Sequence, residues 1–91
     1  MKIRFFGTYR RITGQTEIDW NSNAQTVKEL IDELSRVYGE KLKDRIMADP
    51  DKLSNDVIIL INGKSESFME KANTRIKMDD QISIFPMAFG G

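Results

Sequence analysis

Apolar and polar residues alternate along three short stretches of the chain, Lys2–Phe5, Thr16–Trp20 and Gln81–Phe85. Alternation with a period of two predicts half-buried β-strands. Phe6 follows the first strand and Phe85 ends the last one, and both rings fall on the face opposite to the inward-pointing residues. The two rings are therefore expected on an uncovered face of a sheet, either as a partner surface or simply as exposed aromatic residues.

One amphipathic helix is predicted over Thr26–Tyr38. Its apolar residues recur at i, i+3, i+4 and i+7 spacing and form a single stripe, which consists of Val27, Leu30, Ile31, Leu34, Val37 and Tyr38. Thr26 and Glu29 have the spacing of a capping box at the start, and Gly39 suits the position just past the end. The stripe is expected to pack into the core.

Two segments of the first half carry mainly turn signals. Residues 7–14 are expected to form a loop that joins the first two strands as a hairpin. Residues 40–55 are polar and mixed, and they are expected to form a variable insertion with a short helix around Leu42 and Ile46. Asp49-Pro50-Asp51 within this insertion is a turn signal.

The second half begins with the continuous apolar run Val57–Ile61, which predicts a strand buried on both faces. Asn62-Gly63 follows it directly and is a strong hairpin signal, so Lys64–Phe68 is expected to form a short return strand. Residues 69–80 then make a polar connection, in which two apolar residues are expected to act as anchors, Ile76 and Met78.

This order of elements predicts an α+β protein with a mixed sheet of four to five strands and one main helix across one face. The first and last strands are expected to lie side by side at the centre of the sheet. Such a pairing would bring Phe6 and Phe85 close together on the uncovered face.

The composition removes several classes of function. The 91 residues make one small domain, which has fourteen basic and fourteen acidic side chains but neither cysteine nor histidine. A thiolate nucleophile, a disulfide and a histidine acid–base group or metal ligand are therefore excluded. Balanced charge and the lack of a long apolar run argue against nucleic acid and membrane partners, and no signal peptide is present. We expect a soluble cytoplasmic protein that holds no metal and is not an enzyme by itself.

The last residues suggest a different kind of chemistry. Pro86 cannot donate to a strand ladder, so we expect a folded domain over residues 1–86 and a flexible tail over residues 87–91. Gly90 and Gly91 lack Cβ atoms and can enter a narrow channel. A free tail of this length reaches roughly 17 Å, which is enough to carry the terminal carboxylate into the active site of another protein.

The sequence resembles the MoaD/ThiS family of ubiquitin-like sulfur carriers, and within it the small subunit of molybdopterin synthase. The matching segments span nearly the whole chain in the same order: Lys2–Phe6, Arg10, Gly14, Thr26–Tyr38, Ile61–Gly63, Asp79–Pro86 and Gly90-Gly91. The most specific part is the terminal pattern, in which the last strand ends in Phe-Pro and is followed by three residues and Gly-Gly. The chain departs from the family pattern at five positions, Arg11, Asp80, Gln81, Met87 and Phe89.

The resemblance implies a β-grasp fold and a reaction at the carboxylate of Gly91. In this family an ATP-dependent, ubiquitin-activating-like adenylyltransferase adenylates the terminal carboxylate, and a sulfur donor then displaces AMP and leaves a thiocarboxylate. The carrier itself binds no cofactor. Phe89 and Gly90 are implied to enter the channel of the partner, and four residues are implied to dock on it, Phe6, Phe85, Pro86 and Met87.

Several sulfur acceptors stay open. The length and residues 40–55 favour the molybdopterin branch, in which the tail inserts into the large synthase subunit and gives its sulfur to a pterin precursor. Alternatives are a sulfur carrier for thiamine, cysteine or tRNA thiolation, and a protein modifier that is joined to lysines through Gly91. A plain ubiquitin-like interaction module with an inert tail is the alternative outside these classes.

Overall fold

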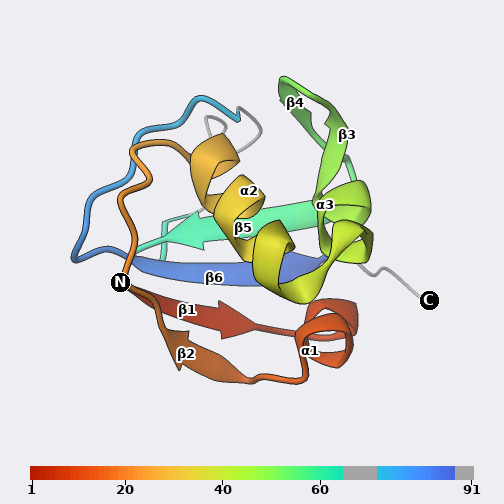
Figure 1. The fold of residues 1–91 in the computed structure, drawn as a ribbon, viewed down its shortest axis with the longest axis horizontal. Helices are drawn as coiled ribbons and strands as arrows, with labels where there is room; N and C mark the ends of the chain where they lie inside the picture. The colour runs from red at the N-terminus through yellow and green to blue at the C-terminus, as the bar shows by residue number, and fades with distance from the viewer. Residues whose placement is uncertain (65–71, 88–91) are drawn as a thin grey trace.

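A four-stranded mixed sheet with the strand order β2-β1-β6-β5 forms the centre of the computed structural model, which describes residues 1–64 and 72–87 (Figure 1). The strands are β1 (Lys2–Phe5), β2 (Glu17–Asp19), β5 (Val57–Ile61) and β6 (Gln81–Pro86). β1 pairs with β6 in parallel, whereas β1 with β2 and β5 with β6 are antiparallel pairs. The predicted α+β class, the mixed sheet and the central position of the first and last strands are confirmed.

Helix α2 (Val27–Tyr38) crosses one face of this sheet, as predicted. The hydroxyl oxygen of Thr26 caps its start by accepting a hydrogen bond from the backbone N–H of Glu29 at 3.2 Å. The carboxylate of Glu29 accepts in turn from the backbone N–H of Gln25 at 2.8 Å, one residue before the cap. Gly39 has a φ of 99°, which favours glycine, and it separates α2 from the short helix α3 (Glu40–Ile46).

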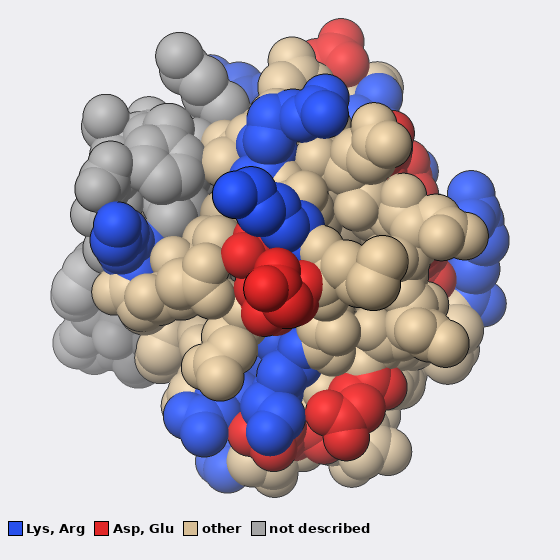
Figure 2. Space-filling model, turned by 90° about the vertical axis from the view of Figure 1, so that its left-hand side faces the viewer, with Lys and Arg blue, Asp and Glu red and all other residues tan. Residues whose placement is uncertain are grey.

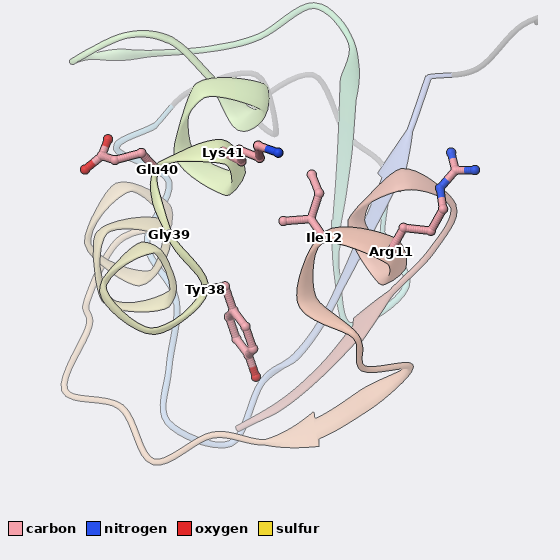
Figure 3. A pocket seen from close by; sticks show the side chains of 6 residues that line it. All are labelled: Arg11, Ile12, Tyr38, Gly39, Glu40 and Lys41. Atoms are coloured by element: carbon pink, nitrogen blue, oxygen red, sulfur yellow. The ribbon is translucent and has the colours of Figure 1, made fainter.

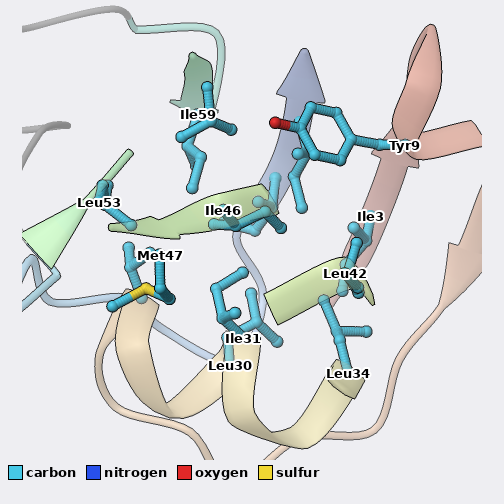
Figure 4. Close-up of a cluster of buried hydrophobic side chains, with 14 of the residues drawn as sticks. Ile3, Tyr9, Leu30, Ile31, Leu34, Leu42, Ile46, Met47, Leu53 and Ile59 are labelled. Atoms are coloured by element: carbon cyan, nitrogen blue, oxygen red, sulfur yellow. The ribbon is translucent and has the colours of Figure 1, made fainter. Parts of the chain in front are cut away.

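The core lies between α2 and the sheet, and α3 closes one end of it (Figure 4). The stripe of α2 packs against inward-pointing residues of the central strands. Full burial of each such aliphatic side chain stabilises the fold by about 1.5–3 kcal/mol. The buried residues of these elements are Ile3, Phe5, Val27, Leu30, Ile31, Leu34, Leu42, Ile46, Val57, Ile59, Ile82 and Ile84.

The loop predicted for residues 7–14 was wrong, because Thr8–Thr13 forms a helix, α1. Tyr9 is buried against the core and gives this helix its anchor. The hydroxyl of Thr13 donates to the Tyr9 carbonyl oxygen at 2.9 Å. Gly14 ends the helix with a φ of 71° and a backbone hydrogen bond of 2.8 Å to the Arg10 carbonyl oxygen.

Three burial predictions were also wrong. Val37 belongs to the apolar stripe of α2 by spacing, yet it is 63% exposed because it lies at the edge of the stripe near the end of the helix. Met78 is 73% exposed and does not anchor its segment, although Ile76 does. Strand β5 is buried on one face only, since Ile58 and Leu60 are half-buried on the face that α2 does not cover.

The insertion over residues 40–55 contains more regular structure than expected. The predicted short helix is α3, and the predicted turn at Asp49-Pro50-Asp51 joins two strands that the sequence did not indicate, β3 (Met47–Asp49) and β4 (Lys52–Leu53). The side chains of Met47 and Leu53 are buried and attach this hairpin to the core.

A tight turn follows β5 at Asn62 and Gly63, whose φ values of 55° and 80° fit the predicted hairpin signal. Asn62 also joins the start of β6: its side-chain N–H donates to the Asp80 carboxylate at 2.9 Å, and its side-chain oxygen accepts from the Gln81 backbone N–H at 2.9 Å. Lys64 forms a bridge to Ile61, and the rest of the predicted return strand lies outside the described residues.

Among the described residues, no helix combines the length and the apolar character that are needed to cross a membrane. Basic and acidic side chains are interspersed on the side of the molecule that lies at the left of Figure 1 (Figure 2).

Candidate docking site and tail root

Two phenylalanine rings stack on the uncovered face of the sheet. The Phe6 and Phe85 ring centroids are 4.2 Å apart and their planes differ by 9°. The parallel register of β1 and β6 produces this contact, because Phe5 pairs with Ile84 and the following residue of each strand points to the opposite face. The sequence prediction that these two rings meet is confirmed, and both remain half-buried.

Apolar surface extends from the rings toward β5. Ile58 lies opposite Phe85 in the antiparallel register and is half-buried. The docking patch, as we call it, consists of Phe6, Ile58 and Phe85. Stacked rings beside an aliphatic side chain on an open sheet face are typical of a protein–protein contact, in which aromatic anchors carry much of the binding energy.

Paired charges border the docking patch on the side of β2. Arg4 Nε donates to Glu17 Oε1 at 2.8 Å, and Lys2 Nζ lies 3.7 Å from Glu17 Oε2. The hydrogen bond from Arg4 is the main reason why the pKa of Glu17 lies below its usual range. One carboxylate, that of Glu17, therefore pairs with two basic side chains on this side of the uncovered face.

Pro86 and Met87 form the tail root, the point where the chain leaves the sheet. Pro86 pairs with Val57 in the register of β5 and β6, and the Met87 backbone N–H donates to the Asp56 carbonyl oxygen at 2.7 Å. Gly7 packs directly against the proline ring, since a Cβ atom on Gly7 would lie 2.7 Å from Pro86 Cγ. Contacts from two sides thus fix the position from which the last residues depart.

The other predicted site residues lie beyond this point. Phe89, Gly90 and Gly91 are outside the described residues, so their roles stay predictions. Of the four predicted docking residues, Phe6 and Phe85 come together in the docking patch, while Pro86 and Met87 form the adjoining tail root. The structure brings these two pairs to the same end of the β1 and β6 strands (Figure 1).

Sequence reasoning missed Gly7 and Asp56, which hold the tail root. Gly7 was recognised only as a turn residue, although a glycine directly after an exposed aromatic residue can mark a close approach of another segment. Asp56 acts through its backbone carbonyl oxygen, which every residue type possesses, so no sequence signal existed for it.

A hollow of about 340 Å³ lies beside the tail root, and its lining includes Tyr9, Arg11, Arg45, Asp56 and Met87. Burial raises the pKa of Tyr9 to about 12, so its phenol is protonated at physiological pH. Two further hollows follow along α1 and α3, and Figure 3 shows one of them. Within the described residues, no group of three acidic side chains is arranged to hold a metal ion.

Comparisons with known proteins show sequences that are similar to this chain. The family model described as the ThiS family matches residues 3–91. Small archaeal modifier protein 3 of Haloferax volcanii is 29% identical, over 100% of this chain and 98% of that protein. A protein of Archaeoglobus fulgidus, provisionally described as a sulfur carrier protein, is 33% identical, over 86% of this chain and 85% of that protein.

A solved structure shows the same arrangement of elements. The solution structure of the HVO 2177 protein of Haloferax volcanii has a TM-score of 0.79 and 30% sequence identity, and it covers 99% of this chain and 84% of that chain.

Proposed function

The chain belongs to the ThiS family of ubiquitin-like β-grasp proteins, which are sulfur carriers or modifiers and not catalysts, and from this we propose that Gly91 is the site at which sulfur is loaded. A carboxylate oxygen of Gly91 attacks the α-phosphorus of ATP and releases pyrophosphate. A sulfur nucleophile then adds to the carbonyl carbon and expels AMP, which leaves a thiocarboxylate. ATP and the catalytic side chains belong to an adenylyltransferase partner.

The tail root is the observation that carries this proposal. Contacts with Gly7, Val57 and Asp56 hold Pro86 and Met87, so the last residues start from a fixed point beside the docking patch. The chain has no cysteine, which excludes a persulfide on a side chain. The terminal carboxylate is then the group left to carry sulfur.

Loading is measured by intact mass spectrometry after incubation with the cognate activating enzyme, ATP and sulfide. We expect the wild-type protein to gain the mass difference between sulfur and oxygen. Deletion of Gly91, or addition of one residue after it, moves the carboxylate by about 3.4 Å. Because a misplacement of about 1 Å can cost on the order of 100-fold in rate, both variants should fail to load.

The matched control is Met78→Ala, which changes an exposed side chain in the segment before β6 and should load at the wild-type rate. Gly90→Val is expected to fail as well, because a β-branched side chain does not fit a channel that is shaped for bare backbone. A Gly91-deleted protein that gains the same mass at the normal rate would contradict the sulfur-carrier proposal.

For the acceptor, we propose the large subunit of molybdopterin synthase. The support is the length of the chain and the segment 40–55, which forms α3 and the β3–β4 hairpin. The test combines the thiocarboxylate form with a molybdopterin synthase large subunit and its pterin precursor. Formation of molybdopterin, and its absence with the Gly91-deleted protein, is the expected result. Loaded protein that keeps its sulfur in this mixture would point to another acceptor, such as the enzymes of thiamine, cysteine or tRNA thiolation.

Protein modification is a second candidate function. The similarity to a small archaeal modifier protein extends over the whole chain, and the same adenylated terminus serves both reactions. A lysine amine would attack the carbonyl carbon in place of sulfur and form an isopeptide bond. Tagged protein expressed in cells should then appear in larger covalent conjugates, with Gly-Gly remnants on lysines of the targets. Equal conjugates from a Gly91-deleted control would exclude this function.

A further inference from the structure

Three hollows adjoin one another along the outer side of α1 and α3. The first, of about 520 Å³, is lined by residues that include Arg11, Ile12, Tyr38 and Lys41. The second, of about 500 Å³, shares Ile12 and Lys41 with the first. The second hollow shares Arg45 with the third, which is the hollow at the tail root. We call the three together the α1–α3 groove, which runs from Tyr38 to the tail root.

Basic side chains outnumber acidic ones in each part of this groove. Arg11, Lys41 and Arg45 each line two of the three hollows, and none of them forms an ion pair within residues 1–64 and 72–87. The acidic residues are Glu40, Asp44 and Asp56, and each lines only one hollow. Figure 3 shows the Lys41 side chain pointing toward Ile12 across the first hollow, whereas Glu40 points away.

The floor of the groove is apolar. The side chains of Ile12 and Tyr38 are half-buried, and the Tyr38 ring packs edge-on against Phe5 with centroids 6.0 Å apart. An aliphatic group can therefore be buried between the basic side chains. A chain with a formal net charge of zero and an acidic residue in each hollow is a poor match for a phosphate backbone. A peptide that combines carboxylates with an aliphatic side chain matches both features.

We infer that the α1–α3 groove binds an acidic segment of the activating adenylyltransferase, with its carboxylates at Arg11, Lys41 and Arg45 and an aliphatic side chain over Ile12. This inference rests on the proposed function. The groove ends at Met87, where the last residues leave the body, so a partner that takes up the tail also lies next to the groove. Docking then uses two surfaces, the docking patch and the α1–α3 groove, with the tail root between them.

The first test measures the KM of this protein in ATP–pyrophosphate exchange by its activating enzyme. Arg11→Gln, Lys41→Gln and Arg45→Gln should each raise KM about two- to five-fold at low salt, which is the range for a partly exposed ion pair, and leave kcat unchanged. The triple variant should lose most of the salt dependence of KM. The matched control is Lys52→Gln, which removes an exposed lysine outside the groove. A triple variant with the KM and salt dependence of this control would overturn the inference.

The second test works without any enzyme and so separates this inference from the proposed function. A six-residue peptide of alternating glutamate and leucine is titrated into isotopically labelled protein, and its glutamine–leucine counterpart is the control. Saturable amide shifts that are confined to the residues lining the groove, in Gly7–Thr13, Tyr38–Ile46, Asp56 and Met87, and that occur with the acidic peptide only, are expected. Equal shifts with the control peptide or with hexauridylate, or none at all, would overturn the inference even if Gly91 is loaded normally.

Discussion

Gly7 and Gly14 flank α1, and both have positive φ values, 56° and 71°. Gly14 has a ψ of 13° and is left-handed helical, a conformation in which a side chain costs roughly 1–2 kcal/mol. Gly7 has a ψ of −127°, which glycine adopts far more readily than other residues, so a side chain there costs more. The two glycines differ in their surroundings. A Cβ atom on Gly7 would lie 2.7 Å from Pro86 Cγ, whereas nothing is within 4 Å of the corresponding position on Gly14. At Gly7 a less accessible backbone conformation and a steric contact with the tail root therefore act together, whereas only the backbone conformation matters at Gly14.

We predict that Gly7→Ala lowers the free energy of unfolding more than Gly14→Ala does, by about 1–2 kcal/mol, because the proline ring must move and the backbone conformation of Gly7 suits alanine less well. Urea denaturation of both variants measures the difference. The displaced Pro86 should also slow the loading of Gly91, while the Gly14 variant loads normally. Equal stability and equal loading of the two variants would show that the tail root accommodates a methyl group without cost.

The parallel pairing of β1 with β6 places Phe6 beside Phe85. Phe6→Ala or Phe85→Ala is predicted to weaken binding to the activating enzyme by about 1–3 kcal/mol, which is the range for an aromatic anchor at an interface. Isothermal titration calorimetry gives the affinity, and thermal denaturation shows whether the variant is folded. Val37→Ala serves as the control, since this residue is 63% exposed on α2. Normal binding of both phenylalanine variants would exclude the docking patch as the contact.

The success of sequence reasoning also varied by element. Helical spacing identified α2, and period-two alternation identified β1, β2 and β6, although β2 has only the half-buried Ile18 on its inner face. Helix α1 has only six residues, and two of them are buried, Tyr9 and Thr13, so no stripe could be recognised. In β5 the continuous apolar run hid the difference between its two faces, because the uncovered face also carries isoleucine and leucine.

One part of the candidate site could be predicted from the sequence and another could not. Period-two alternation placed Phe6 and Phe85 on one face, and the expected central pairing of their strands then brought them together. The α1–α3 groove could not be predicted, because it depends on a helix that the sequence did not reveal. Arg11 lies in the segment that was expected to be a loop, and it is far in sequence from Lys41 and Arg45.

On the scale of the whole molecule, the sheet depends on a strand from each end of the chain. β6 lies between β1 and β5 and supplies the buried residues Ile82 and Ile84. We predict that a chain that stops at Asp80 is unfolded, because β5 loses the strand it pairs with in this sheet and β1 keeps only β2. A chain that stops at Met87 keeps every described contact and should stay within about 0.5 kcal/mol of the full chain. Circular dichroism and urea denaturation test both truncated chains. Cooperative unfolding of the chain that stops at Asp80 would contradict the central role of β6.

The pairing of β1 with β6 also governs when the protein can fold. Parallel pairing of the first strand with the last one is a long-range contact, and such contacts slow folding relative to local ones. During synthesis the first strand must wait until Gln81–Pro86 has left the ribosome, so an interrupted chain stays open to proteases. The completed chain folds only after its final strand has emerged, and residues 87–91 follow that strand directly. Degradation of unfinished chains would thus enrich the folded pool in molecules whose synthesis has passed Pro86.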